Sequence, residues 1–363
     1  MSVLAAIAVL ALLIVIHELG HFSAARLQNI HVNRFSIGFG PTLLKYQGKE
    51  TEYAIRAFPL GGYVGFPDDD PDSDIPPEDP DLLRNRPIFD RAIVISAGVI
   101  ANLIFAYFLL VTQAGTVGFQ DIDYQPGVRI PDVLTAVASP AAQAGIQSED
   151  VVLSVNNTPL STGQDALEEL RDLIQDAPGK SLTLQILRDS ETVSVEVTPD
   201  AGNDGKGKIG VMLAPNGEIV RRRAENPVAA LQAGSREFQR LIGLTVQGFA
   251  QLISNFGETA QQVAGPVAIV AVGADLAKDD LSNLFQFGSL ISINLAIINI
   301  LPLPALDGGQ LAFLLVEGLR GRPLPMRIQE NIMQTGLVLL LGLGVFLIVR
   351  DTVNLAFFQN LMR

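Results

Sequence analysis

The sequence predicts a polytopic α-helical membrane protein with about four transmembrane helices, a β-hairpin in one loop and an inserted β-rich domain. Of its 363 residues, 48% are hydrophobic and 17% are charged, whereas soluble domains carry about 25% charged residues. The apolar residues also gather in four long runs instead of recurring at core periodicity. Both observations favour an integral membrane protein over a soluble globular one.

The amino-acid composition excludes several kinds of functional site. Cysteine is absent, which excludes disulfides, cysteine-ligated zinc, iron–sulfur clusters and thiol nucleophiles. The net charge of −13 argues against nucleic acid as a partner, and eight of the acids fall within residues 68–81. Histidine chemistry must use His17, His21 or His31, the three histidines of the sequence.

Each apolar run is long enough to cross a bilayer, which takes about 20 residues. We expect the first run to be a retained helix, since no basic segment precedes it as in a signal peptide. Pro302 and Pro304 end the third run, because proline interrupts a helix. The runs cover residues 2–16 with the helix continuing to residue 26, 92–111, 284–303 and 332–349.

Basic residues in the loops predict the orientation, because loops rich in Lys and Arg stay on the cytoplasmic side. Those between the first two spans are Arg26, Arg34, Lys45, Lys49, Arg56, Arg84, Arg86 and Arg91, and those between the last two are Arg320, Arg322 and Arg327. We therefore expect both loops in the cytoplasm. Both termini and residues 115–280 should face the other side of a bacterial inner membrane.

The expected domain organisation follows from these spans. The first transmembrane helix covers residues 1–27, a cytoplasmic loop 28–90, the second transmembrane helix 91–114 and the inserted β-domain 115–205. An amphipathic helix and membrane-proximal linker then cover residues 206–281, the third transmembrane segment 282–320, and the fourth transmembrane helix with the C-terminus 321–363.

The cytoplasmic loop has two distinct parts. Residues 51–66 alternate apolar and polar side chains and reach Gly61 and Gly62, a pattern that predicts a β-hairpin with a glycine-rich turn. This hairpin is expected to dip towards the membrane lipid. Residues 67–81 are dense in proline and aspartate, so we expect them to be disordered or extended.

The inserted domain is expected to be a small β-sandwich with one or two helices. Its β-type runs are bounded by turn residues and flank one amphipathic helical segment at residues 164–174. The runs cover residues 133–137, 150–155, 181–187 and 192–197.

The strongest local signal is His17-Glu18-Leu19-Gly20-His21. On a helix, residues four apart lie on one face, so the two imidazoles can bind one zinc ion while Glu18 lies beside the metal-bound water. The alternative is a polar helix end that reaches the membrane interface without a metal. Ionisable residues in a membrane span are costly and usually functional, which favours the metal site.

A catalytic zinc ion needs a third protein ligand and an open fourth position. Cysteine is absent and His31 lies in an unpatterned loop, so a carboxylate is required. Asp307 is the best candidate, because prolines break the span before it and Gly308 and Gly309 permit close backbone approach. Broken helices in membranes line buried or water-filled cavities. The alternative is an interfacial turn with a solvated aspartate.

These motifs together resemble the site-2 protease family of intramembrane zinc metalloproteases, specifically its bacterial RseP-like group. The histidine motif at residues 17–21 is paired with Asn-x-x-Pro-x-Pro-x-Leu-Asp-Gly at residues 299–308. The match extends to residues 56–64, to Gly-x-x-x-Asn at residues 98–102 and to Ala-Gly-Pro-Val-Ala-Ile at residues 264–269.

The resemblance implies a zinc metalloendopeptidase. By position, zinc would be held by His17, His21 and Asp307. Glu18 would be the catalytic acid and base in a metal-assisted hydrolysis. The implied substrates are the transmembrane helices of single-span membrane proteins, such as anti-sigma factors or remnant signal peptides.

The resemblance also implies supporting residues around the substrate. Asn102 and Asn299 would lie near the substrate or the oxyanion. The hairpin at Gly61 and Gly62 would pair with an unwound substrate strand, as in other cases of strand addition.

The inserted domain resembles a PDZ domain through Ser-Pro-Ala-Ala-Gln-Ala-Gly-Ile at residues 139–146 and Glu-Asp-Val-Val-Leu-Ser-Val-Asn at residues 149–156. The carboxylate-binding Gly-Leu-Gly-Phe loop is not evident near residues 126–131. The segment also has room for one such domain, where the RseP-like group often carries two. We therefore expect a size filter or a docking surface for a regulatory partner as readily as peptide capture.

Two other functions fit parts of the pattern. One is a catalytically idle scaffold that binds structural zinc and holds partners through its PDZ module, but a structural site has no need of Glu18. The other is a membrane-anchored zinc peptidase acting on soluble peptides, but Leu27 stands where the extended motif of such enzymes needs a further histidine.

Overall fold

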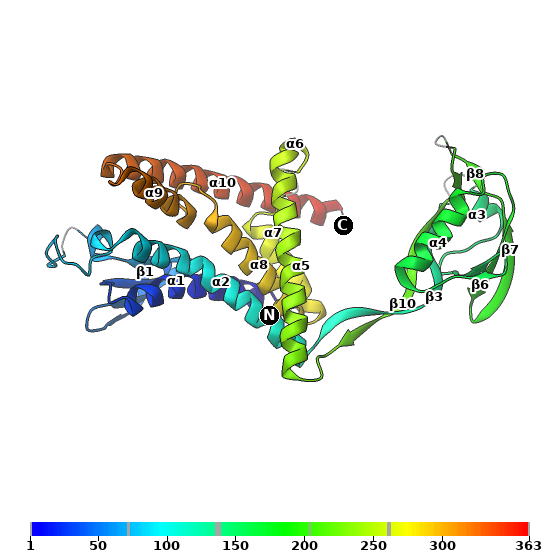
Figure 1. Cartoon of the computed structure of the whole chain (residues 1–363), viewed down its shortest axis with the longest axis horizontal. Helices are drawn as coiled ribbons and strands as arrows, with labels where there is room; N and C mark the ends of the chain where they lie inside the picture. Colours follow the sequence, from blue (N-terminus) through cyan, green and yellow to red (C-terminus); the bar gives the residue numbers. More distant parts are fainter. Residues whose placement is uncertain (1, 71–72, 135–138, 203–204, 260–262, 362–363) are drawn as a thin grey trace. The chain divides into compact units, whose positions relative to one another are not determined.

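The computed structural model describes residues 2–70, 73–134, 139–202, 205–259 and 263–361 (Figure 1). They form two compact units, which are treated separately below. The membrane unit comprises Met1–Gly118 and Arg223–Arg363, and the inserted unit comprises Phe119–Arg222.

The membrane unit contains the four expected spans. Among the described residues, four helices are long and apolar enough to cross a membrane, which confirms the expected number. The helices are α1 (Ser2–Leu27), α2 (Ile88–Thr116), α8 (Asn283–Ile300) and α10 (Met326–Leu361). Helices α2 and α10 extend beyond their apolar runs at both ends, whereas α8 ends at Ile300, before the end of the run at residues 284–303.

Helix α2 packs against α1 and α8 and joins them. Small residues let these helices approach closely: a Cβ added at Gly20 of α1 would lie 2.8 Å from the Cβ of Ala101. The hydroxyl of Ser292 in α8 donates to the carbonyl oxygen of Asn102 at 2.8 Å. Small residues and hydrogen bonds of this kind associate helices in membranes. Helices α1 and α8, which are far apart in the sequence, are thereby held against the same helix.

The remaining helices of the membrane unit complete its framework. Helix α8 ends at Ile300, and Pro302 and Pro304 interrupt it as expected before α9 (Asp307–Arg320) begins. Arg91 of α2 forms an ion pair with Glu317 near the end of α9, with Nη2 and Oε1 2.5 Å apart. The expected amphipathic helix is α5 (Pro227–Ser254), followed by α6 (Phe256–Thr259) and α7 (Pro266–Asp279).

The loop between α1 and α2 forms two long strands, β1 (Arg34–Gln47) and β2 (Glu52–Gly65). The expected hairpin within residues 51–66 is therefore wrong. Gly61 and Gly62 lie inside β2, and the connection between the strands is the short segment 48–51. The alternation of apolar and polar residues at 51–66 predicts a strand, but it does not show that β1, the partner of this strand, comes before it in the sequence.

Each long strand passes through the sheet in two segments. Residues 34–37 pair in parallel with residues 52–55 and antiparallel with residues 62–65, while residues 44–47 pair antiparallel with residues 52–55. Residues 34–37 and 52–55 thus form the middle of the sheet. Residues 62–65 form one of its edges.

The acidic segment after β2 is more ordered than expected. Its described residues include the short 3-10 helix η1 (Pro67–Asp69), and a second, η2 (Leu83–Asn85), follows it. The Asp68 carboxylate accepts hydrogen bonds from the backbone N–H groups of Leu83 and Arg84 at 3.2 and 2.9 Å. Residues 71–72 lie outside the described residues. Backbone N–H groups and basic side chains thus offset the repulsion among the acidic residues, which was the reason to expect disorder.

The inserted unit is built on one six-stranded sheet, with the order β10-β3-β4-β6-β7 and with β5 paired to β4. A separate pair, β8 (Asp200–Ala201) and β9 (Gly207–Lys208), lies outside this sheet. The strands of the large sheet are β3 (Phe119–Val133), β4 (Val151–Val155), β5 (Thr158–Pro159), β6 (Leu182–Arg188), β7 (Glu191–Val197) and β10 (Val211–Arg222).

The helices α3 (Pro140–Gln143) and α4 (Gly163–Gln175) complete the inserted unit. Buried residues of α4, such as Leu167 and Leu170, share one hydrophobic core with the large sheet. The expected β-sandwich is therefore wrong, because a helix takes the place of a second large sheet.

The expected end of the inserted domain at residue 205 is also too early. Strand β10 pairs along the whole of β3 and carries the sheet to Arg222. The other expected strands and the helix agree closely with β4, β6, β7 and α4. The expected strand at 133–137 falls largely on residues 135–138, which lie outside the described residues.

A buried ion pair stabilises the inserted unit. Arg188 donates through Nη2 and Nε to the two carboxylate oxygens of Asp150 at 2.7 and 2.8 Å, and the backbone N–H of Gln147 donates at 2.8 Å. Asp150 is 1% exposed. Burial alone would raise the pKa of Asp150, but the hydrogen bonds from Arg188 and Gln147 hold it below its ordinary value.

We predict that Arg188→Leu lowers the free energy of unfolding of the inserted unit by roughly 3 kcal/mol at pH 7, because it leaves a buried carboxylate without its partner. In the wild type, the lowered pKa of Asp150 adds stability above the unfolded-state pKa of about 3.9. This stability is lost as the pH falls through the lower folded-state pKa. Hydrogen exchange of the β4 and β6 amides in the full chain measures both effects. Equal protection in variant and wild type at pH 7 would contradict the prediction.

Candidate metal centre

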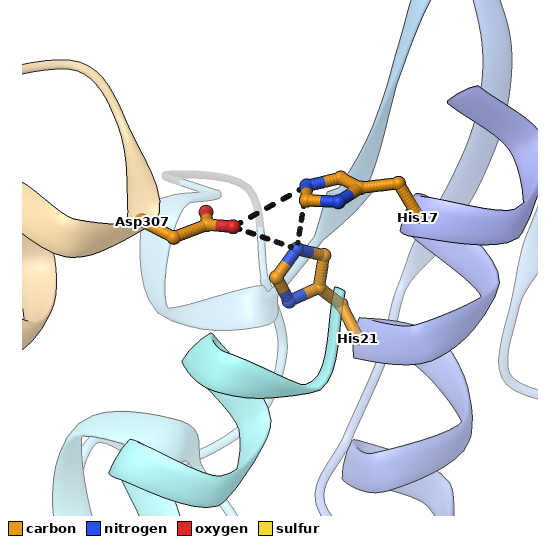
Figure 2. A group of neighbouring side chains, drawn as sticks. All are labelled: His17, His21 and Asp307. Atoms are coloured by element: carbon orange, nitrogen blue, oxygen red, sulfur yellow. Dashed lines mark hydrogen bonds and ion pairs between the residues drawn. The ribbon is translucent and has the colours of Figure 1, made fainter. Parts of the chain in front are cut away.

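Helix α1 presents His17 and His21 on one face, and the N-terminus of α9 brings Asp307 to them (Figure 2). The Nε2 atoms of the two histidines lie 3.2 Å apart. Oδ2 of Asp307 lies 3.3 Å from Nε2 of His17 and 3.5 Å from Nε2 of His21. The structure thus brings Asp307 to two histidines that lie near the other end of the sequence.

The spacing of these three atoms fits a zinc ion. Nitrogen and oxygen ligands bound about 2.0–2.2 Å from one zinc ion at tetrahedral angles lie roughly 3.3–3.6 Å from one another. The three measured distances are close to this spacing. Oδ2 of Asp307 is also buried without a hydrogen-bond partner among the described residues, and a cation would satisfy it. The donor set therefore fits zinc with three protein ligands.

A second group of possible ligands lies elsewhere, in the loop between α1 and α2. His31, Asp79 and Asp81 have ligand atoms within 4.8 Å of one another. However, Asp81 is already paired with Arg86 at 2.8 Å, and Asp79 accepts from the backbone N–H of Asp81 at 2.8 Å. These two carboxylates already accept hydrogen bonds from a guanidinium and a backbone N–H, whereas Oδ2 of Asp307 faces the two imidazoles and has no hydrogen-bond partner among the described residues. His31 therefore lies outside the site, as expected.

The backbone of α2 orients His21. Nδ1 of His21 lies 2.8 Å from the carbonyl oxygen of Val94. A carbonyl accepts a hydrogen, so Nδ1 carries the proton and Nε2 is free to bind a metal. Ligating histidines usually donate their other ring N–H in this way.

Asn102 has the corresponding place behind His17. Its side-chain amide lies 3.3 Å from Nδ1 of His17, and the residue is 0% exposed. The amide atom nearest to His17 is Nδ2, whereas a metal on Nε2 of His17 requires the proton on Nδ1. With the amide turned by 180°, Oδ1 of Asn102, which is buried without a partner, accepts this proton. Asn102 is thus buried on the side of the imidazole that faces away from the metal position, and its expected place near the substrate or the oxyanion stays a prediction.

Asn299 lies on the metal-facing side of the same ring. Its Nδ2 is 3.4 Å from Nε2 of His17, and α8 carries it there one residue before the helix ends. An amide in this position can donate to an oxygen atom bound near the metal. Its support of substrate or oxyanion remains a prediction.

Strand β2 lies directly against Glu18. A Cβ added at Gly62 would lie 2.8 Å from Cγ of Glu18. Gly61 has φ +118°, a backbone conformation that favours glycine. The two glycines thus let an edge of the sheet approach the proposed acid and base without a side chain intervening.

Sequence reasoning missed the role of Gly98. A Cβ at this position of α2 would come within 2.8 Å of Cε1 of His21 and within 2.7 Å of Cε1 of His17. Gly98 is the first residue of the Gly-x-x-x-Asn motif, so a signal was present, but the pattern does not show which side chains the glycine faces. The Val94 carbonyl leaves no signal, because any residue supplies one.

Comparisons with known proteins agree with this geometry. The profile of peptidase family M50 matches residues 5–343. A Nostoc sp. protein named as a zinc metalloprotease is 64% identical over 98% of this chain and 97% of its own. The chloroplastic membrane metalloprotease ARASP of Arabidopsis thaliana is 49% identical over 99% of this chain and 81% of its own.

More distant proteins are similar as well. Protease RseP of Yersinia pestis is 30% identical over 95% of this chain and 97% of its own. The solved PDZ domain of an SdrC-like protein from Listeria innocua covers 24% of this chain and 92% of that chain, with 18% identity and a TM-score of 0.21.

We predict that Gly98→Ala lowers zinc affinity by on the order of 10-fold or more, because the new methyl group displaces both imidazoles from the ligand positions. Gly115→Ala, on the same helix, is the matched control, since its Cβ would meet Ala230 at an ordinary 3.7 Å. Metal content after purification in detergent and competition with a chelator measure the difference. Equal zinc retention by the two variants would show that Gly98 does not fix the imidazoles.

Proposed function

The chain belongs to peptidase family M50, and we propose that it cleaves peptide bonds within or next to the transmembrane helices of single-span membrane proteins. Family membership makes it a membrane zinc metalloprotease. The ligands we propose for zinc are His17, His21 and Asp307. One observation carries the proposal: three metal-binding atoms converge at tetrahedral spacing where a helix long enough to span the membrane meets a broken one.

Each residue of the site has a distinct task in this proposal. Bound zinc polarises the scissile carbonyl and lowers the pKa of its water towards about 7. Glu18 accepts a proton from the attacking water and returns it to the leaving amine. Asn102 and the Val94 carbonyl hold the two imidazoles with Nε2 towards the metal. Asn299 donates to the oxyanion.

The proposed substrate must expose its backbone before it can be cut. In a transmembrane helix every carbonyl is hydrogen-bonded within the helix, so local unwinding precedes attack. Residues 62–65 pair with residues 34–37, and no second strand pairs with them among the described residues. An unwound substrate strand can therefore add to this edge, which passes directly over Glu18.

The orientation we propose places the sheet and the acidic loop in the cytoplasm of a bacterial cell and the inserted unit on the opposite side of its inner membrane. The basic residues of the two short loops support it. The inserted unit contains neither histidine nor cysteine, so it supplies no metal ligand of those types. We propose that it acts as a size filter or as a docking surface for a regulatory partner.

We predict that Glu18→Gln keeps zinc but lowers the cleavage rate by about 10²-fold or more, because glutamine cannot accept the proton of the water. Zinc content and turnover of a membrane-protein substrate in detergent test this together. Comparing membrane-embedded peptides in cells with wild type and variant would then identify substrates. Residual activity within about tenfold of wild type would remove Glu18 from the proton-transfer role.

The proposed orientation predicts a labelling pattern that needs no removal of native thiols, since the chain has none. A cysteine replacing Asn157 should react with an impermeant reagent added outside the cell. A cysteine replacing Asp70 should react only after the membrane is opened. The reverse pattern would overturn the orientation while leaving the metal site as proposed.

A further inference from the structure

The loop of residues 301–306, which we call the ligand loop, carries Asp307 into the metal site. Few hydrogen bonds hold it from within: Leu303 N–H donates to the carbonyl of Leu301 at 2.7 Å, and Leu306 N–H donates to that of Leu303 at 3.3 Å. Ala305 has φ +68°, a left-handed conformation that is strained for a residue with a Cβ. The loop therefore needs support from elsewhere to stay in this shape.

Helix α10 supplies this support at two adjacent points. The backbone N–H of Ala305 donates to Sδ of Met333 at 3.3 Å. A Cβ at Gly336 would come within 2.7 Å of the carbonyl carbon and oxygen of Pro304. Residues 333 and 336 lie one turn apart on the same face. This face of α10 thus packs against the strained residue and the proline before it.

The contacts of α10 elsewhere show that this attachment is local. Most side chains around it are exposed, including Leu337, Val338 and Leu339. It is also attached near its C-terminal end, where Arg350 donates to the carbonyl of Val263 and the Asp351 carboxylate accepts from the backbone N–H of Ala268 in α7 at 3.0 Å. Between these points α10 meets little of the protein, so Met333 and Gly336 carry the contact with the ligand loop.

We propose that Met333 and Gly336 are positioning residues for the metal site, which hold Ala305 in its left-handed conformation and thereby place the Asp307 carboxylate opposite the two imidazoles. The inference rests on the proposed function, in which Asp307 is the third zinc ligand. Neither residue touches zinc or substrate in this scheme. Their effect reaches the metal through two peptide units of the ligand loop.

Met333→Leu tests the hydrogen bond, because leucine keeps a similar volume and removes the sulfur acceptor. Zinc release to a chelator should become on the order of 10-fold faster, the scale seen when groups that orient metal ligands are lost. The visible spectrum of the cobalt-substituted protein should change, because the ligand geometry changes, and kcat should fall more than KM rises. Met326→Leu, at the exposed start of the same helix, is the control and should match wild type.

Rescue distinguishes positioning from a general loss of packing. Ala305→Gly removes the strain of the left-handed conformation, so the loop needs Met333 less. In the Met333→Leu background it should restore slow zinc release and the cobalt spectrum at least partly. A double variant that releases zinc faster than Met333→Leu alone would overturn the proposal, because the strain at Ala305 would then not be what Met333 opposes.

Gly336→Ala tests the close contact with Pro304. Its methyl group should push α10 from the ligand loop and speed zinc release at least as much as Met333→Leu. Gly342→Ala is the matched control on the same helix, since a Cβ there meets nothing within 4 Å. If Gly336→Ala does not fold, Met333→Leu and its rescue still decide the question.

The zinc content of Asp307→Ala separates the two levels of the argument. If Asp307→Ala still binds zinc tightly, Asp307 is not the third ligand and the proposed function fails with the inference. If Asp307→Ala loses zinc while Met333→Leu matches wild type in zinc release, cobalt spectrum and kcat, the proposed ligands stand and the role of Met333 is refuted. Zinc loss in Asp307→Ala with faster release and rescue in the Met333 variants supports both.

Discussion

The structure depends on the convergence of two imidazoles and one carboxylate among apolar membrane helices. Ionisable groups are costly in such surroundings, and these three lie within 3.5 Å of one another, with the carboxylate oxygen short of a donor. Helix α2 makes the convergence possible although it supplies no ligand. Its Gly98 leaves room for the rings, while Val94 and Asn102 bind the ring nitrogens that face away from the metal. The Gly-x-x-x-Asn motif of α2 thus has two roles. Gly98 leaves room for the two imidazoles, and Asn102 orients His17.

Local patterns predicted those parts of the fold that local physics determines. The four spans follow from hydropathy, and the break before Asp307 follows from Pro302 and Pro304. Strand pairing was harder, because the partner of a strand can lie far away in sequence. Residues 62–65 pair with residues 34–37, and β10 returns to β3 from the far side of the inserted unit. Gly61 and Gly62 predict a turn from the sequence alone, whereas in the structure they lie within β2 and let this strand approach Glu18.

The proposed metal ligands could be predicted because the chain offers so few alternatives. Without cysteine, and with three histidines, elimination led to a carboxylate, and the broken third span singled out Asp307. The supporting groups could not be found in the same way. The importance of Gly98 depends on a distance to side chains on another helix, that of Val94 on a backbone atom, and that of Asn102 on which face of His17 it meets. Spacing in a sequence contains none of these quantities.

A ligand carried by a broken helix raises a problem that a ligand on a continuous helix does not. His17 and His21 are fixed by the hydrogen bonds of α1 itself, whereas the backbone groups of residues 301–306 leave the helical pattern and need other partners. The polar N–H of Ala305 is satisfied by a thioether of α10, a weak acceptor that tolerates an apolar setting. The position of Asp307, the proposed third ligand, therefore depends on the position of α10. This helix is exposed along most of its described length, and Asp351 attaches it to α7 near its C-terminal end. A shift of α10 at Met333 and Gly336 therefore acts directly on the loop that carries Asp307.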